Sequence, residues 1–383
     1  MKTVIFVDDE VSILEGLRRN LRRMRREWDM HFFAEPVEAL SFLQANPVDV
    51  IVSDMRMPGM NGAELLQAVQ ASRPETLRLA LSGYADSELI LESVHAIHRY
   101  IAKPADIDTI CAAVTRSITL QEQLSQPSLH AYVGALGALP SLPHIYDQLM
   151  QLISSDDFAL EDVAALIEAD VGLSATVLKI VNSAFFGNFG TIESLKQAVS
   201  VLGSDTIKNI VLTEKLVKQF DKADTDELER INGLSKSVSA LSHRFARSAK
   251  LSKRDADHTQ LAGMVSGLGD MILLDRGVLE GSDVQIEPPL IAAYLLSLWA
   301  MADPIVEAVA GHRVAVDPAA EPNPSGVSTA DCVRAAWLAL DANPTGEGVD
   351  LDEVSAQLRP AFTQLAQDAA LADTWIEAIE TVA

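Results

Sequence analysis

Three aspartates, one serine and one lysine each follow a short run of mostly apolar residues. Asp8 and Asp9 follow the first run, and Asp54 follows the third. Ser82 and Lys103 follow the fourth and the fifth. Short β-branched runs that end at turn residues are typical of buried strands in a parallel sheet. Chemistry in such sheets lies just beyond the carboxyl ends of the strands, so we expect these five side chains to meet at one edge.

The three carboxylates predict a magnesium site. Crowded carboxylates repel one another, and a divalent cation among them relieves that repulsion. Mg²⁺ prefers oxygen ligands and would neutralise charge on an incoming phosphoryl oxygen. Lys103 offers a second positive charge, and Ser82 offers a hydroxyl that can bond to a phosphoryl oxygen. Each residue alone is more typical of a turn or a cap, but together they predict that Asp54 accepts a phosphoryl group.

Five strands and five helices alternate in residues 1–124 and would position these side chains. The predicted strands are Thr3–Val7, His31–Ala34, Val48–Ser53, Arg78–Leu81 and Tyr100–Ala102. The predicted helices are Ser12–Trp28, a segment with Val37, Leu40 and Leu43, then Ala63–Ala71, Ser87–Ile97 and Asp106–Leu124. Ser12 is the expected N-cap of the first helix, with Glu15 completing a capping box. The alternation predicts a doubly wound α/β fold.

Residues 1–124 resemble the receiver domain of two-component response regulators. The matching motif positions are Asp8-Asp9, Asp54, Ser82 and Lys103-Pro104. The resemblance implies a flavodoxin-like fold, a phosphorelay, and phosphorylation of Asp54 by a sensor histidine kinase. It allows a homodimer through the last strand and helix of this domain.

The same resemblance assigns individual roles. It implies that Mg²⁺ is bound by Asp8, Asp9, Asp54 and the main-chain carbonyl of Arg56. It also pairs Ser82 with the aromatic Tyr100 as a coupled switch. When a phosphoryl group draws Ser82 inward, space opens beside it, and Tyr100 rotates into that space.

The first predicted helix carries six arginines on its polar face: Arg18, Arg19, Arg22, Arg23, Arg25 and Arg26. One interpretation is an ordinary solvated helix face. The other is an electrostatic landing site for an acidic partner, either a kinase domain or the acidic second half of this chain.

From residue 137 onward the pattern is helical, which predicts an all-α array. A linker at 125–136 includes the break Ser125–Ser128. The predicted helices are Ile145–Ile153, Leu160–Glu168, Ser174–Asn182, Leu195–Leu202, Thr206–Lys218, Leu228–Ala249, Gln260–Leu274, Pro289–Ala300, Ile305–His312, Thr329–Leu340 and Leu351–Ile379. We expect Pro360 to divide the last of these. Residues 341–383, which include the break Asn343–Gly348, are expected to form an acidic helical extension.

Residues 137–340 resemble the HDOD output domain. The segments that carry the resemblance are Leu139–Pro143, Ala169–Ser174, Val181–Gly187, Ile192–Leu195, Ala198-Val199 and Leu202-Gly203. HDOD domains are relatives of the HD phosphohydrolases that have generally lost the metal ligands. The resemblance therefore implies a non-catalytic domain that transmits the signal through contacts with an unknown downstream protein.

The metal ligands of the enzymatic relatives are absent from this sequence. Their central His-Asp pair is Ser266-Gly267 here, and two further ligand positions fall near Ser237 and Trp337. The remaining candidate ligands are His243, His258 and His312. None has an acidic partner at helical spacing, and Asp257 beside His258 points to another face. A receiver-controlled metal-dependent phosphohydrolase or cyclic-dinucleotide phosphodiesterase is the alternative function.

Charge and composition limit the classes of partner. The net charge is −24, of which residues 1–124 contribute −5 and residues 125–383 contribute −19. A second half this acidic argues against binding to nucleic acid or to anionic lipid. No apolar run is long enough to span a membrane, and the two cysteines predict no disulfide framework. We therefore expect a cytoplasmic phosphoprotein.

Overall fold

The computed structural model describes most of the chain. The described residues are 1–83, 89–90, 93, 95–123, 130, 133–134, 136, 139–153, 158–182, 192, 194–212, 222–275, 287–317, 325–342 and 351–380. The predicted breaks Ser125–Ser128 and Asn343–Gly348 lie outside them, as does much of the predicted helix Ser87–Ile97. The chain divides into two compact units. One holds Met1–Ala138, Leu178–Thr191 and Tyr294–Ala300, and the other holds Leu139–Val177, Ile192–Ala293 and Met301–Ala383.

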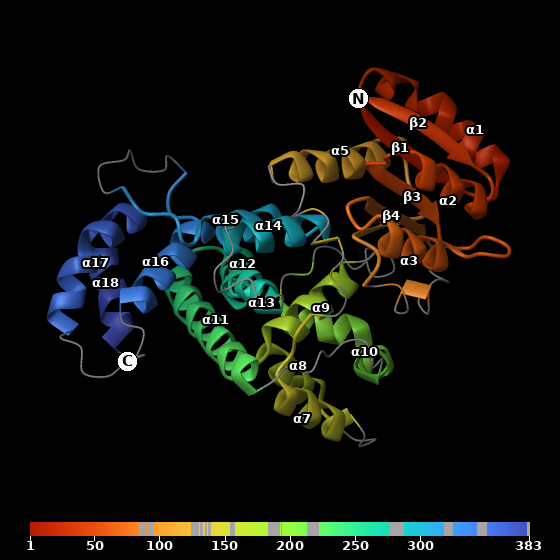
Figure 1. Ribbon diagram of the computed structural model, residues 1–383. Helices are drawn as coiled ribbons and strands as arrows, with labels where there is room; N and C mark the ends of the chain where they lie inside the picture. Colours follow the sequence, from red (N-terminus) through yellow and green to blue (C-terminus); the bar gives the residue numbers. More distant parts are fainter. Residues whose placement is uncertain are drawn as a thin grey trace. The chain divides into compact units, whose positions relative to one another are not determined.

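The first unit contains one sheet of five parallel strands (Figure 1). The strands are β1 (Lys2–Val7), β2 (Trp28–Phe33), β3 (Val50–Asp54), β4 (Leu77–Ser82) and β5 (Arg99–Ala102). The order across the sheet is β2-β1-β3-β4-β5. The helices α1 (Val11–Asn20), α2 (Pro36–Ala45), α3 (Gly62–Ser72) and α5 (Ile107–Gln123) connect or follow the strands. This order is that of flavodoxin-like proteins and confirms the predicted fold.

The central strand β3 is buried along its whole length. Val50, Ile51 and Val52 pair with β1 on one side and with β4 on the other. A strand in this position is covered on both faces by helices, which is why its sequence is apolar without alternation. Leu43 from α2 and Leu66 from α3 belong to the core cluster that covers it. The packed core therefore fixes where β3 ends, at Asp54.

The bounds predicted for the first helix differ from the observed bounds at both ends. Helix α1 ends at Asn20, a 3-10 helix η1 (Leu21–Arg26) follows, and Trp28 already lies in β2. Glu10 occupies the N-cap position without a side-chain hydrogen bond, so the predicted cap at Ser12 does not form. The apolar period continues through η1 because Leu21 is fully buried, and the period alone does not distinguish the two kinds of helix.

The chain beyond α5 returns to the first unit. Arg78, a fully buried residue of β4, donates hydrogen bonds to the main-chain oxygens of Pro74 (3.0 Å) and Gly134 (2.6 Å). Gln70 Nε2 donates to the Leu136 carbonyl at 3.1 Å. Burial lowers the pKa of Arg78 to about 9. A Cβ atom on Gly134 would lie 1.7 Å from the Pro74 oxygen, so only glycine permits this approach. The segment around Gly134 is therefore held against the N-terminal end of β4.

The rest of the described chain is helical, as predicted. Its helices are α7 (Pro143–Ile153), α8 (Leu160–Glu168), α9 (Val171–Val181), α10 (Leu195–Leu212), α11 (Lys222–Ser248), α12 (Lys253–Met264), α13 (Leu268–Asp275), α14 (Pro288–Leu298), α15 (Asp303–Gly311), α16 (Thr329–Ala342), α17 (Leu351–Ala366) and α18 (Ala369–Glu380). Among the described residues, no helix is both long and apolar enough to cross a membrane.

Two predicted helices of this region are interrupted at positions that the sequence did not indicate, and a third interruption falls where it was expected. The predicted helix Gln260–Leu274 is interrupted after Met264 and forms parts of α12 and α13. Gly203, with a φ of 72° and a ψ of 168°, is non-helical and separates two helices within α10, where the prediction placed a break between residues 202 and 206. Pro360 lies inside α17, and the break comes later, at Gln367 with a φ of 56°. Gly203 and Gln367 have a positive φ, whereas Val265, at the interruption after Met264, has a φ of −92°.

The last two helices belong to the core of the second unit. Trp375 is fully buried and stacks on Phe245 of α11, with ring centroids 4.8 Å apart. Phe362 of α17 meets both rings edge to face, and Trp375 Nε1 donates to Ser248 Oγ at 3.0 Å. The predicted extension is therefore an integral part of the helical unit.

Candidate functional site

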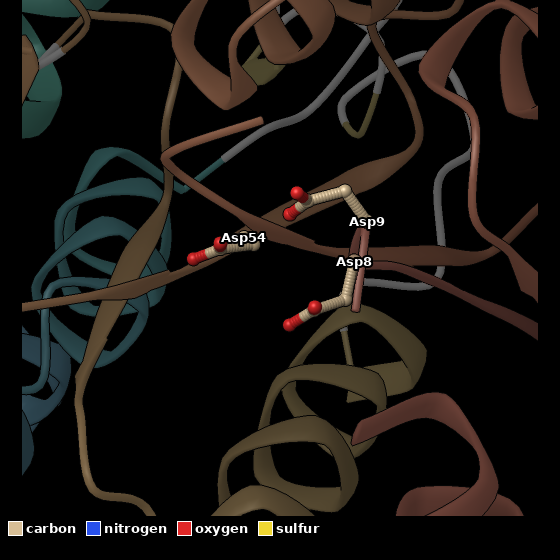
Figure 2. Close-up of side chains that lie close together, drawn as sticks. All are labelled: Asp8, Asp9 and Asp54. Carbon is tan, nitrogen blue, oxygen red and sulfur yellow. The ribbon is translucent and has the colours of Figure 1, made fainter. Parts of the chain in front are cut away.

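Asp8, Asp9 and Asp54 lie together at the carboxyl edge of the sheet (Figure 2). Each offers a carboxylate oxygen, and these oxygens lie within 4.8 Å of one another. Strands β1 and β3 pair in parallel, Val7 opposite Ser53, so the residues that follow them emerge side by side. Asp8 and Asp54 are buried, whereas Asp9 is exposed. The arrangement brings three negative charges to one partly enclosed place.

Lys103 completes the group from the end of β5. Its Nζ lies 2.6 Å from Asp54 Oδ1 and 3.6 Å from Asp8 Oδ2. Its main-chain N–H donates to the Ser82 carbonyl at 2.8 Å, which fixes the lysine beside the end of β4. Burial lowers the pKa of Lys103, but its hydrogen bond to Asp54 and the nearby carboxylates outweigh burial and raise the pKa overall. The lysine therefore remains charged and paired with Asp54.

Two buried polar atoms at this edge have no hydrogen-bond partner among the described residues. They are Ser82 Oγ and Asp8 Oδ2. Buried polar groups are nearly always satisfied, so unsatisfied ones indicate room for a ligand that satisfies them. Burial also raises the pKa of Asp8, because the charged form loses solvation. A cation or a phosphoryl oxygen would supply what these atoms lack.

The main chain holds Asp54 in one orientation. The Met55 N–H donates to Asp54 Oδ1 at 2.8 Å, which, with Lys103, fixes that oxygen. Gly62, the first residue of α3, packs against the same segment. A Cβ atom there would lie 2.0 Å from the Asp54 carbonyl oxygen. The roles of Met55 and Gly62 are not apparent from the sequence pattern, although Gly62 directly follows the turn after Asp54.

Tyr100 lies apart from the carboxylates, in the body of β5. It belongs to the core cluster, and its hydroxyl lies 3.2 Å from Ser93 Oγ and donates to the Ile90 carbonyl at 3.2 Å. Burial raises its pKa. The ring is therefore in an inward position, held by hydrogen bonds to residues that precede β5.

The donor set fits Mg²⁺. Three carboxylates offer the hard oxygen ligands that this ion prefers, and one buried oxygen, Asp8 Oδ2, lacks a hydrogen bond. Asp9 is exposed, so coordinated water can remain on that side. Arg56 follows in the loop after β3, with an exposed side chain. Three of the four predicted ligands, Asp8, Asp9 and Asp54, are brought together, and the role of the Arg56 carbonyl stays a prediction.

The predicted arginine face is exposed. All six arginines of α1 and η1 have exposed side chains. Arg23 forms an ion pair with Asp108, and the guanidinium of Arg18 lies 5.0 Å from the centre of the Phe32 ring. The face presents several cations on a protein whose net charge is −24.

Three of the four positions considered for HD-type ligands border one cavity in the second unit. Ser237, Gly267 and Trp337 line it, whereas Ser266 is buried and donates to the Gly263 carbonyl at 2.8 Å. A Cβ atom on Gly267 would lie 2.3 Å from Ser235 Oγ and 2.8 Å from an Ile231 methyl carbon. A ligand side chain at position 267 would therefore require the side chains of Ser235 and Ile231 to shift.

The three remaining histidines do not gather around this cavity. His243 Nδ1 lies 3.1 Å from the Ala256 carbonyl, and His258 is buried in α12. His312 is buried against the edge of Trp337, and burial lowers its pKa to about 4. In the part of the helical unit that the structure describes, no three His, Cys, Asp or Glu side chains converge as a metal site would require.

Comparisons with known proteins match two family profiles to successive parts of the chain. The profile described as "Response regulator receiver domain" matches residues 4–115, and that described as "HDOD domain" matches residues 139–280. The hydrogenase transcriptional regulatory protein HoxA of Cupriavidus necator is 38% identical over 121 residues. That match covers 31% of this chain and 24% of the relative, so the chain matches about a quarter of the relative's length.

Two solved structures are also similar. The signal receiver domain of an HD domain-containing protein from Pseudomonas fluorescens Pf-5 is 28% identical, with a TM-score of 0.30, and the match covers 32% of this chain and 98% of that one. The response regulator MmoQ from Methylococcus capsulatus is 16% identical, with a TM-score of 0.46, and the match covers 62% and 98% of the two chains. The parallel sheet with its edge of aspartates, and the two profiles in this order, identify the chain as a response regulator receiver domain followed by an HDOD domain.

Proposed function

We propose that Asp54 accepts a phosphoryl group from a sensor histidine kinase and that the helical half transmits this event through contacts with another protein. The observation that carries the proposal is the convergence of three aspartates and Lys103 on one edge, beside the unsatisfied Ser82 hydroxyl. A kinase of this kind as the phosphoryl donor, and the cytoplasm as the location, are part of this proposal, and the receiver domain supports them. The exposed arginine face of α1 and η1 offers a surface for docking that kinase.

The orientation of Asp54 indicates which oxygen reacts. Oδ1 is held by the Met55 N–H and by Lys103, so Oδ2 is the oxygen that attacks phosphorus. The bond from phosphorus to the donor's histidine nitrogen breaks as the new P–O bond forms, which gives an acyl phosphate. Mg²⁺, held by Asp8, Asp9, Asp54 and the Arg56 carbonyl, would neutralise charge on the phosphoryl oxygens.

Lys103 and Ser82 then act on the product. The lysine, already 2.6 Å from Asp54 Oδ1, can pair with a phosphoryl oxygen with little movement. The Ser82 hydroxyl, buried and without a partner among the described residues, donates to another. Movement of Ser82 leaves space into which Tyr100 turns. That turn breaks the Tyr100 hydrogen bonds near Ile90 and Ser93 and changes the surface before β5.

The output half is proposed to be non-catalytic. The close packing of Gly267 against Ser235 supports this proposal, because the position of a metal-binding aspartate holds no side chain. An absence of converging ligands among the described residues of this half is in keeping with it. As part of this proposal the region extends over residues 137–340, after a linker at 125–136, and α17 and α18 complete the core of the helical unit.

Labelling of the full chain with acetyl phosphate and Mg²⁺ tests the proposal. We expect one phosphoryl group per chain, located at Asp54 by mass spectrometry after borohydride reduction. Asp54→Asn should abolish it, whereas Asp29→Asn, which alters an exposed carboxylate of the same unit, should leave it unchanged. Labelling of Asp54→Asn at the wild-type rate would refute the assignment. Hydrolysis of a cyclic dinucleotide, lost on mutating His243, His258 or His312, would instead support the phosphohydrolase.

A further inference from the structure

A cavity of about 600 Å³ in the helical unit has no part in the proposed phosphorylation. It lies between α11, the start of α13, helix α16 and Arg313, the second residue after α15. Its polar lining includes Arg230, Ser237, Asp270, Arg313 and Asp341. Pockets of roughly 300–1,000 Å³ with a few convergent polar groups are the usual size for small ligands.

One planar cation is fixed in the wall of this cavity. Arg313 forms a two-point ion pair with Asp270: Nη1 donates to Oδ1 at 3.0 Å and Nη2 donates to Oδ2. Its guanidinium lies 4.2 Å from the centre of the Trp337 ring. The side chain is 24% exposed. A guanidinium held at its edge and on one face presents its other face as a stacking surface for a flat ring.

The charged residues that line the cavity carry no net charge in sum. Arg230 and Arg313 bring two positive charges, and Asp270 and Asp341 bring two negative charges. A bare anion would meet as much repulsion as attraction there, since Arg313 is already paired. Arg230 is different, because its partner Glu227 is a neighbour on the same exposed helix face, and such surface pairs exchange readily. The cavity therefore favours a ligand that carries both an anionic group and hydroxyl donors.

We propose that this cavity binds a nucleoside monophosphate without converting it. Its base stacks on Arg313, its ribose hydroxyls donate to Asp341, and its phosphate pairs with Arg230. Ser237 adds a hydroxyl beside the ring. The proposal goes beyond the phosphorylation of Asp54 and does not depend on it, because every residue named belongs to the helical unit.

Calorimetry with the full chain tests this binding. The probes are AMP, GMP, adenosine and inorganic phosphate. We expect saturable 1:1 binding of at least one nucleotide, binding of its nucleoside about tenfold weaker, and none of phosphate alone. Failure of both nucleotides to bind with a Kd below about 1 mM, or equal binding of phosphate, would overturn the proposal.

Variants separate the contacts. Arg230→Gln should reduce affinity for AMP to that for adenosine and leave adenosine unchanged. Arg359→Gln is the matched control, because Arg359 is also exposed and paired, with Asp373 on the neighbouring helix, and should leave both affinities unchanged. Arg313→Lys keeps the positive charge but removes the planar guanidinium, so it should weaken the binding of AMP and of adenosine alike. Equal affinities in all variants would contradict the site.

Gly233→Leu blocks the cavity with little risk to the fold. Gly233 lies in α11 on the cavity wall, and a Cβ atom there meets no atom within 4 Å. Leucine also favours the helix over glycine, so the thermal midpoint should stay the same or rise. We expect nucleotide affinity to fall more than tenfold. Unchanged nucleotide affinity in this variant would place the ligand elsewhere and refute the proposal.

Discussion

At the scale of single residues, the structure shows how much one main-chain contact constrains Asp54. Gly62 begins α3 directly against the Asp54 carbonyl, and any side chain would meet main-chain atoms that have no room to move. The helix can approach β3 closely only because this residue has no Cβ. The backbone that carries the aspartate is therefore set by α3 as well as by the strand.

Gly62→Ala should separate α3 from the end of β3. The added methyl would lie 2.0 Å from the Asp54 carbonyl oxygen, and overpacking of this kind costs about 1–3 kcal/mol. Urea unfolding should show that loss, and labelling by acetyl phosphate should slow. Gly16→Ala is the control, because a Cβ atom at that helical glycine meets nothing within 4 Å. A Gly62→Ala chain as stable and as readily labelled as wild type would contradict this account.

His312 predicts a dependence of stability on pH. Its Nδ1–H donates to the Val309 carbonyl at 2.7 Å, and its Nε2 accepts from Arg313, so the folded ring is neutral. Burial, with the charge of Arg313, lowers its pKa from 6.5 to about 4. The folded state then binds fewer protons than the unfolded state between these values. Stability is complete above pH 6.5 and falls by about 2–4 kcal/mol as the pH drops to 4.

Hydrogen exchange of α11 and α16 peptides measures this dependence. Protection in wild type should decrease between pH 6.5 and pH 4, after correction for the intrinsic exchange rate. His312→Gln should reduce the decrease, while His144→Gln, at an exposed position, should not. An identical decrease in His312→Gln would assign the pH dependence to other groups.

At the scale of elements, the features that depend on the apolar pattern were predictable from the sequence. The features that depend on backbone geometry were not. The carboxyl ends of β1 and β3 were predictable, because a buried parallel strand is continuously apolar, whereas the edge strand β2 begins at Trp28 and not at the predicted His31. The change from the α-helix α1 to the 3-10 helix η1 was not predictable, because either kind of helix would place Leu21 in the core. The break at Gln367 follows from a positive φ, and a glutamine in the sequence does not indicate such a conformation.

Gly134 was also invisible in the sequence, because its importance lies in a contact made across 60 residues with Pro74. Gly134→Ala should release the segment that Arg78 and Gln70 hold. We expect faster hydrogen exchange in a peptide spanning residues 133–136, with exchange of β4 little changed. Arg78→Lys, which keeps a charge but not the fork of donors, should have a similar effect. Unaltered exchange in both variants would show that these contacts do not hold the segment.

At the scale of the whole molecule, helices α17 and α18 of the acidic tail form part of the folded core of the helical unit. The sequence predicted only an acidic helical extension there, and the structure shows that its aromatic residues complete the helical core. Trp375→Ala should destabilise the helical unit by about 3–5 kcal/mol, because a fully buried indole leaves a large void. Trp375→Phe should cost less. Thermal unfolding followed by hydrogen exchange should show the loss in α11 and leave the β-sheet unit unaffected.

The position of that indole in the chain has a consequence for synthesis. Phe245 leaves the ribosome 130 residues before Trp375, the ring that covers it. Until translation passes that point, a nascent chain carries an uncovered aromatic surface of the kind that chaperones recognise. A premature stop in the last helix would therefore release a product prone to aggregation and degradation, even with every residue of the phosphoacceptor edge in place.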